Sequence, residues 1–270
     1  MRVSELLSHL LARFPKESAE PWDHIGLSVG DPASEVAGVC CALDATERNI
    51  RRAHDAGANV LLTHHPVYIK APDAFTPADP SGPSSAAAVY TAARLGISVI
   101  SLHTNLDRSV EAREALPALV GAAPSSSLEH EDPAELGLGA VCEIAATSLG
   151  DFAQRVADAF WSDPRVWGEP DRPLSRVAFL GGSLGGFGEL AIARGCSAVV
   201  TGEAGYHTAQ DLALRGCPVI ALGHDRSEEP FRGILARACA QAGVPQDRIS
   251  SLRSPVQWRT YIGKDSHEPR

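Results

Sequence analysis

Short apolar segments alternate with helix-like segments along most of this 270-residue chain. Residues 36–43 and 59–63 are apolar runs of strand length, and the stretch between them opens at Thr46 and closes at Gly57, as a capped helix does. A helix over 85–95 and a strand over 97–102 continue the order. Strands and helices that alternate in this way form largely parallel sheets covered by helices. The sequence therefore predicts an α/β fold.

The same pattern predicts a two-lobed protomer. A stretch poor in regular structure, 122–133, interrupts the alternation, which resumes after a glycine cluster near residue 181. We expect residues 1–122 and 190–270 to form one α/β core together, and 134–189 to form a small middle lobe. The outer segments repeat the same strand and helix order, which predicts a pseudo-duplicated arrangement. A chain of this length has no room for a large inserted domain.

Composition and charge exclude several classes of protein. The chain is 44% apolar and 21% charged, within the ordinary globular range. No stretch has the length of a membrane span, and the first 14 residues lack the apolar core of a signal peptide. The net charge of -9, without a basic cluster, argues against generic binding to nucleic acid. Six cysteines without a Cys-x-x-Cys pair favour buried free thiols, and thus a cytoplasmic protein.

Three of the expected strands run directly into side chains that bind metals. Ligands of open α/β sheets bind beyond the carboxyl ends of the strands, so residues distant in sequence can converge there. A single histidine after a strand is more often structural, but three such strand ends together favour a metal site. The candidate ligands are His64 and His65 after the second strand, Asp107 after the third, and His224 and Glu228 after the last.

Two adjacent histidines limit the geometry of this site. Successive side chains of a regular strand point to opposite faces, so His64 and His65 reach one ion only if the backbone has left the strand. The simpler interpretation is two divalent ions per chain. Imidazoles with carboxylates suit zinc, iron or manganese. Paired ions with open coordination positions favour hydrolysis of a small anionic substrate.

Other polar residues near the strand ends are weaker candidates. His103, Glu203 and His207 are candidates for proton transfer in the outer shell of the site, or are surface residues. Glu229 competes with Glu228 as a ligand, but Glu228 is four residues from His224 and shares its helix face. The glycine cluster at 181–188 is either an anion cradle or a tight turn.

Together these motifs resemble the dinuclear metal centre hexameric proteins, the NGG-interacting-factor-like family of GTP cyclohydrolase 1 type 2 homologues. The motifs that carry the resemblance, in chain order, are Trp22-Asp23-His24-Ile25-Gly26-Leu27 with Gly30-Asp31, Thr63-His64-His65-Pro66, His103-Thr104-Asn105-Leu106-Asp107, Gly181-Gly182-Ser183, Thr201-Gly202-Glu203 to His207, and Gly223-His224 to Ser227-Glu228. The resemblance covers nearly the whole chain. It departs at His24, where the family usually has Asn.

The resemblance implies metal ligation by His64, His65, Asp107, His224 and Glu228, and a ring-shaped homohexamer. It also implies a cyclohydrolase activity in which metal-activated water opens a guanine ring. The first functional hypothesis is therefore a metal-dependent hydrolase of a small anionic substrate, for which a nucleotide is one candidate. The alternative is a non-catalytic metal-binding scaffold or regulatory hexamer, because a shared metal site does not fix a substrate.

Overall fold

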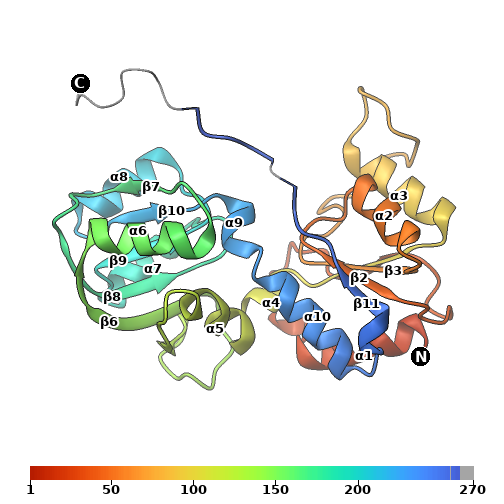
Figure 1. Ribbon diagram of the computed structural model, residues 1–270, viewed down its shortest axis with the longest axis horizontal. Coiled ribbons are helices and arrows are strands. Elements are labelled where there is room, and N and C mark those ends of the chain that lie inside the picture. Colours follow the sequence, from red (N-terminus) through yellow and green to blue (C-terminus); the bar gives the residue numbers. More distant parts are fainter. Residues whose placement is uncertain (256, 262–270) are drawn as a thin grey trace.

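The chain folds into two lobes, each built on one β-sheet (Figure 1). This structure is a computed structural model that describes residues 1–255 and 257–261. Helices pack on both faces of each sheet, so the α/β class expected from the alternating pattern is confirmed. All six cysteines are buried free thiols. Within the described ranges, no helix is both long enough and apolar enough to cross a membrane.

The first lobe has a five-stranded sheet. Its strands, in spatial order, are β1 (Gly26–Val29), β4 (Ser98–Ser101), β3 (Val60–Thr63), β2 (Val39–Ala42) and β11 (Ile249–Ser251). Only β1 is antiparallel to its neighbour. Cys40 and Leu61 pack against α2 (Glu47–Asp55) and α3 (Ser84–Leu95), whereas Cys41 and Leu62 pack against α1 (Val3–Arg13) and α10 (Phe231–Gln241). Burial on both faces explains why these strands are continuously apolar.

Local signals set the ends of the helices in this lobe. The Thr46 hydroxyl accepts the backbone N–H of Asn49 at 3.2 Å and caps α2, a contact that contributes about 1 kcal/mol. Helix α3 ends at Gly96, which takes the left-handed conformation with φ +66° and so accepts the turn without a Cβ clash. Both ends agree with those expected from the sequence.

The second lobe has a six-stranded sheet. Its strands, in spatial order, are β5 (Pro124–Ser126), β6 (Ala140–Ser148), β8 (Pro173–Phe179), β9 (Ala198–Thr201), β10 (Val219–Ala221) and β7 (Arg165–Trp167). The central β8, β9 and β10 are parallel, and the other pairs are antiparallel. One face packs against α5 (Val110–Ala118) and α6 (Leu149–Phe160), and the other against α7 (Phe187–Ala193) and α8 (Tyr206–Leu214). This sheet is mixed, whereas the first is largely parallel.

The expected boundary between the lobes was wrong. Residues 190–270 were assigned to the first core and 134–189 to a small middle lobe, but β9 and β10 belong to the second sheet. Val177 of β8 pairs with Ala198 of β9, and Val199 pairs with Val219 of β10. The chain returns to the first lobe only at α10. Strand and helix order does not reveal which sheet a strand joins, because strand pairing is not local in sequence.

Two short helices carry the strand ends of both lobes toward each other. Helix α4 (Thr104–Asp107) follows β4 of the first lobe, and α9 (His224–Glu228) follows β10 of the second. Both lie between the lobes in Figure 1, where α4 leads on to α5 and α9 leads on to α10. Side chains after β3, β4 and β10 therefore meet in the same region.

Candidate metal centre

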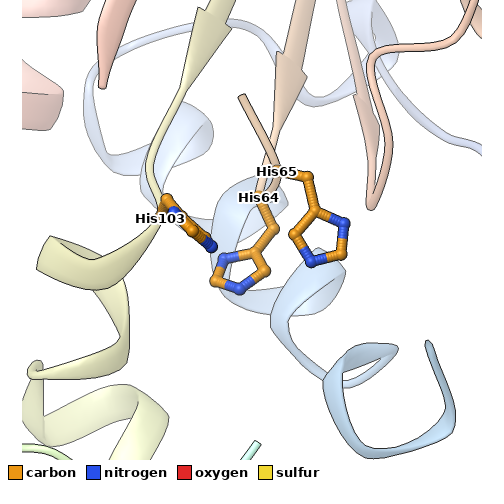
Figure 2. A group of neighbouring side chains, drawn as sticks. All are labelled: His64, His65 and His103. Carbon is orange, nitrogen blue, oxygen red and sulfur yellow. The ribbon is translucent and has the colours of Figure 1, made fainter. Parts of the chain in front are cut away.

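The two adjacent histidines lie directly after β3, on the same side of the chain (Figure 2). The strand ends at Thr63, whose hydroxyl donates to the carbonyl of His65 at 2.7 Å. Because the backbone has left the strand there, the ring centroids of His64 and His65 lie only 5.0 Å apart. In a regular strand the two side chains would point to opposite faces, but here they lie on the same side and can contribute to one cluster.

His64 has a nitrogen that lacks a hydrogen-bond partner. The side chain is fully buried, and its Nδ1 lies 3.0 Å from the carbonyl oxygen of Leu102, which can only accept. Nε2 has no hydrogen bond in the described part of the chain, but it lies 3.5 Å from Oδ1 of Asp107 and 3.6 Å from Oε1 of Glu228. A buried polar atom without a partner destabilises the folded state. A cation bound between Nε2 of His64 and the two carboxylates would supply the missing partner.

Glu228 is the centre of the cluster. Its buried carboxylate places Oε2 at 2.8 Å from Nε2 of His65 and 3.2 Å from Nε2 of His224. Burial opposes its ionisation, but the neighbouring His64 and the hydrogen bonds with His224 hold the pKa of Glu228 well below its usual range. Burial also raises the pKa of Asp107, and the nearby charge of Glu228 adds to this effect. Both carboxylates lie within 3.6 Å of Nε2 of His64, and a cation among these atoms would offset the repulsion between the two negative charges.

Acidic side chains orient the two outer histidines. Nδ1 of His65 lies 2.8 Å from Oδ1 of Asp44, and Nδ1 of His224 lies 3.0 Å from Oε1 of Glu203. Burial works against protonation of His65, but the hydrogen bonds with Asp44 and Glu228 outweigh it and raise its pKa to about 10. The hydrogen bond with Glu228 raises the pKa of His224 to about 9. In both cases the carboxylate fixes the ring and directs Nε2 into the cluster, as around metal-binding histidines.

His103 lies inside the cluster, although we expected it in the outer shell. Its Nδ1 lies 2.9 Å from Oδ1 of Asp23, and it offers a ligand atom within 4.8 Å of those of His64 and His65 (Figure 2). The hydrogen bonds that Asp23 accepts from His103 and Thr104 outweigh burial and lower its pKa to about 2. The geometry of His103 is that of a ligand oriented by a carboxylate.

The other two outer candidates differ. Glu203 contacts His224, as expected of a residue in the outer shell. His207 is exposed, its ring packs against Tyr206 at 5.2 Å, and no hydrogen bond or ion pair among the described residues joins it to the cluster. The alternative ligand Glu229 forms an ion pair with Arg232 instead.

Three residues of the site, Asp44, Asp23 and Gly182, are not among those predicted from the sequence to have a role there. Asp44 follows β2 as the histidines follow β3, which was a usable signal, whereas Asp23 lies in a loop whose position depends on distant packing. Gly182 was seen only as part of a glycine cluster. It has φ +62°, and a Cβ there would lie 2.4 Å from Oε1 of Glu228. Glycine therefore allows the backbone after β8 to approach the carboxylate.

The donor set fits a divalent transition metal. Two groups of three side chains, His64 with His65 and His103, and His65 with His224 and Glu228, each offer ligand atoms within 4.8 Å of one another. Imidazole nitrogens and carboxylate oxygens are the usual ligands of zinc, iron and manganese. The unpaired Nε2 of His64 meets the same requirement. The cluster is thus a candidate metal-binding group that both lobes build together.

Fold and site together define a two-sheet α/β protein with a histidine and carboxylate cluster between its lobes. The model of the Duf34/NIF3 (NGG1p interacting factor 3) family matches residues 1–251. The chain therefore belongs to this family.

Named relatives agree with this assignment, and a solved structure shares the fold. A GTP cyclohydrolase 1 type 2 homolog of Clostridium acetobutylicum is 30% identical over 88% of this chain and 89% of its own length. A homolog of the same name from Streptomyces coelicolor is 28% identical over 99% and 93%. The structure of a Bacillus cereus protein related to NIF3 shares the fold, with a TM-score of 0.84 at 19% identity over 97% of this chain and 99% of that one.

Proposed function

We propose that this protein binds two divalent metal ions per chain and is a metal-dependent hydrolase of a small anionic substrate, of the GTP cyclohydrolase 1 type 2 kind. The arrangement of Glu228 carries the proposal. Its Oε1 faces His64, which also faces Asp107, and its Oε2 contacts His65 and His224. The two oxygens of Glu228 thus face two sets of donors. His64 and Asp107 would hold one ion, His65 and His224 would hold the other, and Glu228 would contribute to both.

The chemistry of the donors supports zinc, iron or manganese as the metal. Bound divalent ions lower the pKa of coordinated water and polarise carbonyl or phosphoryl oxygens, which is the basis of metal-dependent hydrolysis. Two dipositive ions exceed the charge of Glu228 and Asp107, so a hydroxide and an anionic substrate would complete the neutralisation. The nitrogen-rich set argues against calcium and magnesium, which prefer oxygen ligands.

The chain's own polar residues would orient the ligands and move protons. Asp44 holds Nδ1 of His65, and Asp23 holds Nδ1 of His103. Glu203 holds Nδ1 of His224, and its side chain is 58% exposed. It is therefore placed to exchange a proton between the cluster and solvent. His103 is the second candidate for this role when it does not bind a metal.

The names of the relatives support a guanine nucleotide as the first substrate to test. Ring opening by hydrolysis adds the hydroxyl group of water to a ring carbon and a proton to the leaving ring nitrogen. The test is turnover of GTP by protein reconstituted with zinc, iron or manganese, compared with Asp107→Ala, whose fold is checked by circular dichroism. We expect turnover in the wild type and its loss in the folded variant.

A metal-binding scaffold or regulatory hexamer is the competing function. One observation favours it: His64 and His65 come from the first lobe and Glu228 from the second, so bound ions would hold the lobes together. A scaffold would show no turnover with full metal content, and would lose its assembly when metal is stripped. Light scattering measures this assembly, for which we expect six subunits in either case.

A further inference from the structure

A cavity of about 600 Å³ adjoins the metal centre in the first lobe. It is lined by His65 and Asp44, by the first turns of α2 and α3, and by residues of the loop over 78–83. This volume is within the range of small-molecule sites. Because His65 belongs to both the cavity and the cluster, a molecule in the cavity reaches the candidate metal centre directly.

The acidic side chains of the cavity are largely engaged within the protein. Glu47 is paired with Arg51 at 2.6 Å and accepts from Thr91 at 3.1 Å. Asp79 accepts the N–H and O–H of Ser81. Each of these carboxylates uses one oxygen for its contacts within the protein. Their negative charges repel a large anion placed beside them.

Two polar groups of the wall are available. Oδ1 of Asp44 is bonded to His65, but Oδ2 has no hydrogen bond within the described ranges and is not buried, so it can accept an N–H from a ligand. Arg48 is exposed and has no ion pair in the part of the chain that the structure describes, although it lines the cavity. A free guanidinium binds one phosphate or carboxylate well.

Apolar side chains also line the cavity, chiefly Pro66, Val67, Pro83 and Ala87. Proline rings are rigid, so these walls are formed before a ligand enters and cost little ordering entropy on binding. Rigid apolar faces with an acceptor at the cluster end suit a planar ring that carries an N–H group.

We propose that this cavity holds the non-reacting body of the substrate, and that the substrate is a nucleoside monophosphate whose ring amide faces Asp44 and whose phosphate binds Arg48. This inference rests on the proposed hydrolase function and narrows its substrate class. A triphosphate fits less well, because Arg48 supplies one free cation and the additional phosphates would face Glu47 and Asp79.

The test is calorimetric titration of guanosine 5′-monophosphate into the metal-loaded and the metal-free protein. We expect Arg48→Ala to weaken binding by about tenfold or more, the loss of one charged contact. Arg52→Ala is the matched control, because Arg52 is exposed on the same helix and does not line the cavity. Arg52→Ala should bind guanosine 5′-monophosphate as tightly as the wild type does. The wild type should bind GTP more weakly than the monophosphate.

A second pair of variants tests the location without changing charge. Ala78→Trp places a large ring in the cavity, whereas Ala74→Trp adds the same ring to the same loop outside it. Only Ala78→Trp should abolish binding. Equal binding in both variants, or no binding of the monophosphate to the wild type, would overturn the inference. Metal content is measured on every sample, so a missing metal site would refute the proposed function while the metal-free titration still tests the cavity.

Discussion

Nε2 of His65 lies 2.8 Å from Oε2 of Glu228, although the two residues are 163 positions apart in sequence. His65 follows β3 of the first sheet, and Glu228 lies in α9 after β10 of the second. The cluster therefore exists only when both lobes are folded and docked. Any ion bound there stabilises the folded chain and the contact between its lobes.

Removal of metal is expected to lower thermal stability. A ligand that binds only the folded state adds about 3–4 kcal/mol when its free concentration is 100 to 1,000 times its dissociation constant. The unfolding midpoint of the metal-loaded protein should therefore fall after treatment with a chelator and recover when the ion is returned. Identical midpoints before and after chelation would show that no ion links the lobes.

Gly182→Ala is expected to displace the central carboxylate. The added Cβ would lie 2.4 Å from Oε1 of Glu228 and 3.3 Å from Nε2 of His224. Gly185→Ala is the matched control, because Gly185 also has positive φ but a Cβ there meets nothing within 4 Å. Backbone strain is common to both variants, so a difference in metal affinity between them reports the contact with Glu228. We expect Gly182→Ala alone to lose metal affinity, by about tenfold or more, as when the orientation of a ligand is disturbed. Equal affinities in a competition titration would contradict the assigned role of Gly182.

Metal binding is expected to release protons. The hydrogen bond with Glu228 raises the pKa of His224 to about 9, and those with Asp44 and Glu228 outweigh burial and raise that of His65 to about 10. Both rings are therefore protonated at pH 7 in the metal-free protein, and a metal must displace these protons. Calorimetry in two buffers of different ionisation enthalpy should show about two protons released per chain, with affinity increasing from pH 6 to pH 8. Binding enthalpies that do not depend on the buffer would refute this coupling.

Asp23→Asn is expected to lower stability near neutral pH and to have less effect in acid. Hydrogen bonds with His103 and Thr104 outweigh burial and lower the pKa of Asp23 from 3.8 to about 2. Because the folded pKa is below the unfolded one, this stabilisation is present above pH 4 and disappears as the pH falls through 2. It corresponds to about 2 kcal/mol at pH 7.

Urea unfolding of metal-free wild type and Asp23→Asn at pH 7 and pH 2.5 measures how much stability the substitution removes at each pH. Asp73→Asn, a change at an exposed loop position, serves as the control and should match the wild type at both pH values. If the free energies of unfolding of wild type and Asp23→Asn differ by the same amount at both pH values, the charge of the Asp23 carboxylate is not the cause of the stabilisation.

The sequence predicted the cluster better than the lobes. His64, His65, Asp107, His224 and Glu228 could be selected because strand ends meet at one edge of a sheet, and the structure brings these side chains together. That they bind metal stays a prediction, as does pseudo-duplication. The lobe boundary was misplaced because the pairing of β9 with β8 depends on contacts across the sheet rather than on local pattern.

The residues that orient or accommodate the ligands were also hard to predict, because their roles depend on tertiary contacts. Asp23 reaches His103 across 80 positions of sequence, and only folding reveals that contact. Gly182 is required by a close approach of backbone to carboxylate, which no local motif encodes. The sequence predicts His103 in the outer shell, and its place beside His64 and His65 depends on Asp23, which sets the direction of its ring. Local patterns therefore indicate where a site is, and tertiary contacts decide which side chains complete it.

The most direct test of a dinuclear centre is elemental analysis of metal per chain in untagged protein, for the wild type, His65→Ala and Glu228→Ala. His54→Ala is the control, because its ring is exposed and lies near Asp55, outside the cluster. We predict about two ions per chain in the wild type and in the control, and a lower content in both cluster variants. Wild-type protein that holds almost no metal, even after incubation with zinc, iron or manganese, would contradict a dinuclear metal centre.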